Sequence, residues 1–184
     1  MIDLDFEQKE IVCLIERFSK TEKRRRFIWN KFNGNLTCNV IKKYLGKCLR
    51  TNLEVVGPAF INGYPTEFDL MVVDAGSKPE EFTNAYNSES VHLVIEVKSH
   101  GTFSEKALKR IKDIFEDLTN ECSIESVYLA VRESGSPKRK KTKNWIEITR
   151  KMLDPYKVFV LCDSRTKELY PNQWKEFVNA VNLN

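Results

Sequence analysis

The sequence predicts an α/β domain in which α-helices flank both faces of a mixed central β-sheet. From residue 53 onward, short apolar runs alternate with longer segments whose apolar residues recur at helical spacing. One run, residues 91–97, is apolar almost throughout, which is typical of a central strand buried on both faces. No internal repeat or low-complexity segment divides the 184 residues, a length that fits one domain with one core.

Helices are expected where apolar residues recur on one side of a helical wheel. These segments cover residues 5–19, 36–49, 104–118, 145–152 and 171–181. Gly34 is a natural break before the second of them. Pro171 stands in the first turn of the last one, where proline is favoured.

Strands are expected at short runs rich in apolar residues, which cover 53–56, 67–73, 91–97, 126–131 and 156–162. Gly57-Pro58 and Asn62-Gly63 indicate turns between the first two strands. The polar segment 75–90 is expected to be a long surface loop.

Charge is unevenly distributed along the chain, although the net charge is only +4. Residues 20–50 hold ten Lys or Arg and one acid, and residues 132–151 hold eight Lys or Arg. Between them, residues 51–100 hold eight acids and two Lys. Two basic segments flanking an acidic centre suit a protein that binds a polyanion around a carboxylate-lined site. Solvated helix faces beside an acidic loop would give the same pattern.

The cysteines and the N-terminal residues indicate a reducing compartment. The five cysteines are an odd number without a C-x-x-C pair, so we expect reduced, mostly buried thiols rather than disulfides or a zinc site. No apolar run is long enough to span a bilayer, and the first ten residues are acidic, unlike a signal peptide. A cytoplasmic protein without a membrane segment is therefore expected.

Charged residues stand at the ends of two of the expected apolar strands. Glu96 and Lys98 are two positions apart in a strand, so their side chains project from the same face. Glu67 and Asp69 likewise share one face, directly before four apolar residues. Ionised groups are costly to bury unless they are paired or bind a metal. The two strands therefore predict either a functional site or charged residues at exposed strand ends.

A metal site follows if these two strands pair, because Asp69 then approaches Glu96 with Lys98 alongside. Carboxylate oxygens are the ligands that Mg²⁺ and Mn²⁺ prefer. Such an ion polarises a phosphate and lowers the pKa of an attacking water. Lys98 can orient or deprotonate that water, or neutralise charge in the transition state.

Asp69, followed twenty-seven positions later by Glu96-Val97-Lys98, resembles the PD-(D/E)XK signature of the restriction-endonuclease-like nucleases. The resemblance covers residues 36–131 in the order of their expected elements. It implies that Asp69, Glu96 and the Val97 carbonyl bind the metal and that Lys98 assists the nucleophile. It further implies DNA cleavage that depends on Mg²⁺ or Mn²⁺, often by a homodimer.

One departure from the family concerns a further metal ligand. Many relatives carry a glutamate on the helix before the Asp strand, but no acid occurs here between Glu22 and Glu54. The candidates to replace it are Glu67 and three residues of the first expected helix, Glu7, Glu10 and Glu16.

Two basic clusters are expected to contact the DNA backbone, because basic loops bind phosphates without reading the base sequence. They consist of Arg24, Arg25 and Arg26, and of Lys138, Arg139, Lys140, Lys141 and Lys143. A solvated charge run is the alternative for the second cluster.

The whole chain, residues 1–184, is interpreted as a single nuclease-like domain. A helical segment, 1–50, precedes a catalytic core, 51–131, and residues 132–184 complete the sheet and helices. The leading functional interpretation is a metal-dependent DNA endonuclease of restriction, defence or repair. Two alternatives stay open: a non-catalytic nucleic-acid-binding protein with a degenerate nuclease fold, and an interaction subunit of a nuclease or helicase complex.

Overall fold

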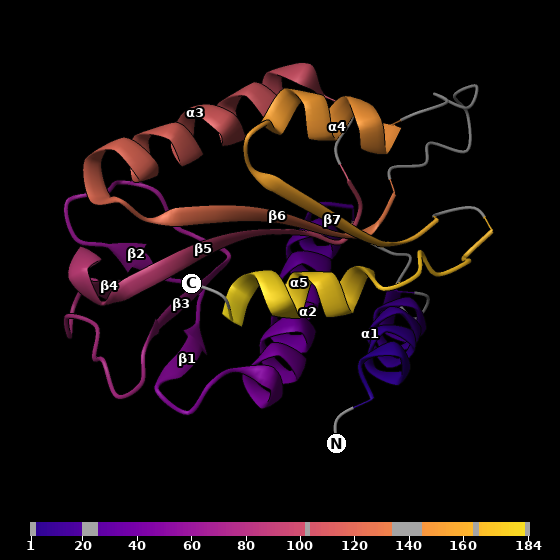
Figure 1. Cartoon of the computed structure of the whole chain (residues 1–184), viewed down its shortest axis with the longest axis horizontal. Helices are drawn as coiled ribbons and strands as arrows, with labels where there is room; N and C mark the ends of the chain where they lie inside the picture. The colour runs from indigo at the N-terminus through magenta and orange to yellow at the C-terminus, as the bar shows by residue number, and fades with distance from the viewer. Residues whose placement is uncertain (1–2, 20–25, 102–103, 134–144, 164–165, 183–184) are drawn as a thin grey trace.

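In the computed structural model of the chain, a five-stranded sheet of order β1-β3-β5-β6-β7 lies between two layers of helices (Figure 1). The structure describes residues 3–19, 26–101, 104–133, 145–163 and 166–182. The strands are β1 (Leu53–Val56), β3 (Leu70–Asp74), β5 (Val91–Lys98), β6 (Glu125–Arg132) and β7 (Lys157–Cys162). β3 pairs antiparallel with β1 and β5, whereas β5–β6 and β6–β7 are parallel, which confirms the predicted mixed sheet.

Helices cover both faces of this sheet, as predicted. One face carries α1 (Leu4–Ser19), α2 (Arg26–Cys48) and α5 (Gln173–Asn182), and the other carries α3 (Glu105–Cys122) and α4 (Trp145–Leu153) (Figure 1). α3 and α4 are the crossovers of the parallel β5–β6 and β6–β7 connections.

The alternation of side chains along β5 decides which face of the sheet carries the charged residues. Ile95 and Val97 belong to the core beneath α1, α2 and α5. Successive residues of a strand point to opposite faces, so Glu96 and Lys98 lie on the other face, toward α3. The buried stripe of α3 includes Ile111. The same face thus combines an apolar helix with two charged strand residues.

The predicted helix break at Gly34 is wrong, because α2 runs from Arg26 through Gly34 to Cys48. A glycine inside a helix costs about 1 kcal/mol relative to alanine. Burial of Cys38, Ile41 and Leu45 against the sheet offsets that cost. Local sequence signals do not include this packing.

Segment 75–90 was expected to be a loop but contains ordered structure. It includes β4 (Ala85–Tyr86), which pairs in parallel with β2 (Phe60–Ile61), and a 3-10 turn, Ser88–Ser90. A two-residue strand is too short to show a periodic pattern, so only its burial reveals it.

The strand predicted for residues 67–73 begins later, at Leu70. Phe68 instead forms an isolated bridge with Ala59. Asp69 therefore lies directly before β3 rather than within it, where its side chain does not have to enter the core.

Cys38 and Cys162 are buried, whereas Cys48 and Cys122 are half-buried and Cys13 is exposed, so the prediction that most of the cysteines are buried is wrong. Burial raises the pKa of Cys38 to about 12 and that of Cys162 to about 11, so both thiols stay protonated at neutral pH. They behave as small apolar groups.

None of the helices in the described part of the chain has the length and apolarity needed to cross a membrane.

Two glycine-to-alanine variants test the packing of this fold. A Cβ at Gly101 would overlap the Trp145 indole, which is buried, so Gly101→Ala is expected to lower the free energy of unfolding by about 1–3 kcal/mol. Gly34→Ala is the matched control, because its Cβ meets no described atom within 4 Å inside a helix. It is expected to raise the free energy of unfolding by about 0.5–1 kcal/mol.

Urea unfolding followed by circular dichroism measures both changes. A Gly34→Ala variant that is less stable than the natural protein would contradict a continuous α2. A Gly101→Ala variant of unchanged stability would contradict the packing of Trp145.

Candidate active site

Asp69, Glu96 and Lys98 converge at the point where β3 begins beside β5. Leu70 pairs with Ile95, so the register places Asp69 next to Glu96. The Lys98 ammonium forms an ion pair with the Glu96 carboxylate and lies 3.5 Å from Asp69 Oδ2. Because one ammonium contacts both carboxylates, they face the same side of the sheet and are close enough to share a cation.

A backbone hydrogen bond fixes the Asp69 side chain. The Val97 N–H donates to Asp69 Oδ2 at 2.9 Å, just beyond the last backbone pair between β3 and β5. A residue within a strand directs its N–H and C=O toward the same neighbouring strand. The Val97 carbonyl therefore also faces the side of Asp69. Both described contacts of Asp69 use Oδ2, which leaves Oδ1 for a ligand.

The three residues line a cavity of about 300 Å³. The remaining lining residues are Thr66, Glu67, Phe68, Ala107, Arg110, Ile111, Ile114 and Phe115. The side chains of Asp69, Glu96 and Lys98 are 33%, 21% and 34% exposed, so a ligand in the cavity can reach them. One wall is apolar because the buried stripe of α3 continues alongside the site.

Burial and charge oppose each other in this group. Burial raises the pKa of Glu96; Lys98 lowers it, and Asp69 raises it further, so that the pKa stays above its usual value. Burial lowers the pKa of Lys98, but the Glu96 and Asp69 carboxylates outweigh it and leave that pKa above its usual value. Two carboxylates against one ammonium leave one net negative charge, which favours a bound cation.

The donor set fits Mg²⁺ or Mn²⁺ in its chemistry, although it is sparse. Within the described ranges, no group of three or more His, Cys, Asp or Glu side chains is placed to hold a metal ion. Glu67 lines the cavity without joining such a group. Mg²⁺ usually binds through one or two carboxylates and keeps several waters. Two carboxylates and the Val97 carbonyl match that pattern.

The α1 glutamates do not supply a further ligand, since their contacts lie elsewhere and none lines the cavity. Their partners are the Trp174 Nε1–H for Glu7, the Tyr44 hydroxyl for Glu10 and the Lys167 ammonium for Glu16. No residue of α2 lines the cavity, and Cys38 of this helix belongs to the core on the opposite face of the sheet. Burial and the charges of Asp69 and Glu96 raise the pKa of Cys38, whereas Lys98 opposes them. Neither α1 nor α2 thus supplies, among the described residues, the further acid that the PD-(D/E)XK resemblance implies.

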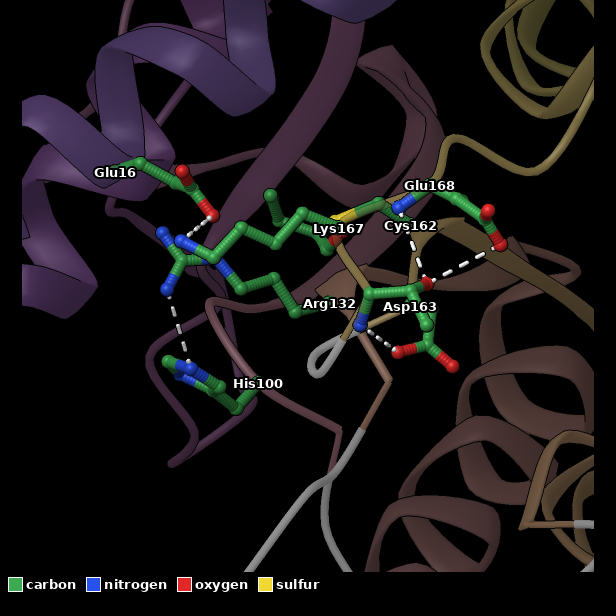
Figure 2. A network of polar contacts seen from close by, with 9 residues as sticks. Glu16, His100, Arg132, Cys162, Asp163, Lys167 and Glu168 are labelled. Atoms are coloured by element: carbon green, nitrogen blue, oxygen red, sulfur yellow. Dashed lines mark hydrogen bonds and ion pairs between the residues drawn. The ribbon is translucent and has the colours of Figure 1, made fainter. Parts of the chain in front are cut away.

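A second polar cluster lies where β6 and β7 end (Figure 2). Arg132 Nη1 is 3.4 Å from His100 Nε2, and the Lys167 ammonium is 3.0 Å from Glu16. Burial and the charge of Arg132 lower the pKa of His100, so His100 is neutral at pH 7. The Glu16–Lys167 ion pair ties α1 to the segment that follows β7.

The predicted nucleic-acid contacts lie outside the described residues, with one exception. Arg24, Arg25 and the cluster from Lys138 to Lys143 fall in segments 20–25 and 134–144. Arg26 begins α2, but its side chain is not described. These contacts remain predictions.

Arg110 is a residue of the cavity that the sequence interpretation missed. Ala107 and Ile114 of the same helix line the cavity, three residues before and four after it. This spacing places all three on one side of α3. One sequence signal could have identified Arg110: it is an arginine beside the apolar stripe of the helix that follows Lys98.

The mixed five-stranded sheet with helices on both faces has a restriction-endonuclease-like fold. Among solved structures, the chain is similar in fold to NucC. The cAAA-bound form from P. aeruginosa ATCC27853 has a TM-score of 0.56 at 14% identity, over 73% of this chain and 64% of that one. For the cAAA-bound form from E. coli MS115-1 the TM-score is 0.55 at 12% identity, over 73% and 63%.

This chain therefore spans just under two thirds of the length of the NucC chains. At identities of 12–14%, the similarity establishes a shared fold. No protein-family model and no curated protein matches the sequence.

A single variant, Lys98→Met, and a double variant, Lys98→Met with Glu96→Gln, test the Lys98–Glu96 pair through protein stability rather than activity. The pKa of Glu96 is raised in the folded state, so the folded protein binds the Glu96 proton more strongly than the unfolded protein does. The contribution of Glu96 to stability therefore falls as the pH rises from the unfolded-state pKa through the folded-state pKa. Lys98→Met removes its partner and is expected to destabilise the protein by about 1–3 kcal/mol at pH 8. A smaller loss is expected at pH 5, where Glu96 can be protonated.

Thermal or urea unfolding at both pH values, without divalent cations, measures this effect. Adding Glu96→Gln to Lys98→Met should remove the pH-dependent part of the loss, because the amide needs no cation partner. Equal stability of the single and double variants at pH 8 would contradict the pairing.

Proposed function

We propose that the chain is a metal-dependent DNA endonuclease, a PD-(D/E)XK endodeoxyribonuclease that hydrolyses phosphodiester bonds. One observation carries the proposal: the carboxylates of Asp69 and Glu96 meet at a single Lys98 ammonium, beside an accessible cavity and within a restriction-endonuclease-like sheet. Charged groups at the end of a buried strand reduce stability, so their convergence favours a functional role.

Asp69, Glu96 and the Val97 carbonyl would hold Mg²⁺ or Mn²⁺. When bound, the ion polarises the phosphate and lowers the pKa of an attacking water. Glu67, which lines the cavity, is a candidate to hold one of the water ligands of the ion. The donor chemistry of these residues supports a hard divalent cation over zinc, which prefers thiolate and imidazole ligands.

Lys98 would act as a charged hydrogen-bond donor. Its pKa lies above the usual value for lysine because Glu96 and Asp69 outweigh the effect of burial. A lysine that keeps its proton at neutral pH can orient a water and neutralise charge in the transition state.

The substrate, assembly and setting of the enzyme follow from the same proposal. The basic clusters around Arg24 to Arg26 and Lys138 to Lys143 would bind the DNA backbone and speed association. Similarity in fold to NucC supports a role in defence over one in repair. We further propose a cytoplasmic enzyme that acts as a homodimer on DNA.

A second candidate is a nucleic-acid-binding protein with a degenerate nuclease site. It is favoured by one feature of the described residues, the lack of a third acidic ligand near Asp69 and Glu96. In that case the fold and the basic clusters would bind DNA without cleaving it.

Cleavage assays separate the two candidates. The purified protein is incubated with supercoiled, linear and single-stranded DNA, with Mg²⁺, Mn²⁺ or a chelator. Cleavage that requires the metal is expected, with a loss of about 10²-fold or more in Asp69→Ala and Lys98→Ala. Asp74→Ala is the matched control, because this exposed acid lies at the other end of β3, where it pairs with His92, and full activity is expected.

DNA binding by the natural protein without cleavage under any condition would favour the degenerate site. Cleavage that survives in Asp69→Ala would contradict the assigned site. A protein that neither binds nor cleaves DNA would leave the interaction-subunit interpretation.

A further inference from the structure

Arg110 is a cation that the proposed metal chemistry does not use. It lies on α3, between Ala107 and Ile114, and lines the same cavity as Asp69 and Glu96. Unlike its buried neighbour Leu108, Arg110 is exposed, so its guanidinium is accessible from the cavity.

Lys98 and Arg110, the two cations in the described lining of the cavity, differ in their contacts with carboxylates. Lys98 is held between Glu96 and Asp69, so its ammonium is occupied. Arg110 forms no ion pair with any described residue. It nevertheless lines the same cavity as the Glu96 carboxylate. The guanidinium is thus close to the site while its donors stay available.

The apolar side chains of α3 in the cavity do not satisfy the hydrogen-bond donors of Arg110. Ile111, Ile114 and Phe115 form the α3 side of the cavity. Apolar side chains accept no hydrogen bonds, and a guanidinium carries five N–H donors in a planar fork. That fork suits the oxygens of a phosphate group, to which arginine binds in a bidentate manner.

The net charge of the site indicates why a further cation would assist the reaction. Asp69, Glu96 and Lys98 carry one net negative charge, and a divalent cation makes the group positive by one. A phosphodiester then neutralises it. Attack by a deprotonated water adds a second negative charge to the phosphate in the transition state, and a further cation stabilises that charge.

We propose that Arg110 is a substrate-binding residue that contacts the phosphodiester group positioned opposite Asp69 and Glu96. This inference rests on the proposed function. It specifies that the cavity binds a phosphodiester group of the DNA and that Arg110 contacts this group from the α3 side. Because the contact strengthens as charge develops, it contributes to the rate as well as to the affinity.

Two measurements on Arg110→Ala, Arg110→Lys and Lys109→Ala test this role. Lys109 is the matched control, an exposed neighbouring cation on α3 that does not line the cavity. The first measurement is kcat and KM for cleavage of a linear duplex with Mg²⁺ or Mn²⁺. The second is the affinity for the same duplex in a chelator, from 50 to 200 mM salt, with circular dichroism to verify folding.

Arg110→Ala is expected to lower kcat/KM by about 10²-fold, mainly through kcat. It should also reduce the slope of log affinity against log salt by about 0.9, the equivalent of one phosphate contact. Arg110→Lys should recover most of the salt slope but only part of kcat, since an ammonium cannot bind two oxygens in a fork. Lys109→Ala should change neither quantity.

If the natural protein cleaves DNA and Arg110→Ala behaves like Lys109→Ala in both measurements, the role of Arg110 is refuted while the proposed function stands. If the natural protein binds without cleaving and Arg110→Ala weakens binding with a smaller salt slope, the phosphate contact stands and the nuclease proposal fails. A natural protein that neither binds nor cleaves DNA overturns both.

Discussion

The sharing of one ammonium by two carboxylates, at the point where a buried strand leaves the core, is the constraint on which the site depends. Apart from His92, β5 is apolar on both faces until Glu96, and the antiparallel register of β3 brings Asp69 beside Glu96. Ionised groups in such a place destabilise a protein unless they are paired. Lys98 pairs with both, and the remaining negative charge suits a cation supplied from solution.

The surrounding fold serves to hold this group rigidly. Backbone pairing on both sides fixes β5, and the Val97 N–H fixes Asp69 just beyond the end of β3. α3 then closes one wall of the cavity with apolar side chains and one arginine. A metal-binding group on strands is more precisely positioned than one on loops, because each ligand is held by packing and hydrogen bonds.

The central part of this arrangement could be predicted from the sequence. A strand buried on both faces is apolar throughout, so Glu96 and Lys98 are conspicuous, and their spacing assigns them to one face. The helix through Gly34 and the short strand at Tyr86 could not be predicted, because tertiary packing stabilises them against weak or absent local signals. Arg110 was missed for a similar reason, since its neighbours on α3 indicate a core-facing stripe.

Because no third acid joins Asp69 and Glu96 in a metal-binding group within the described chain, metal binding is the decisive property. Calorimetric titration of Mn²⁺ into the natural protein, Asp69→Asn, Glu96→Gln and the control Asp74→Asn measures it directly. One Mn²⁺ per chain is expected for the natural protein and the control, with a loss of binding in the other two. Equal Mn²⁺ binding by all four proteins, or none by the natural one, would contradict a cation shared by residues 69 and 96.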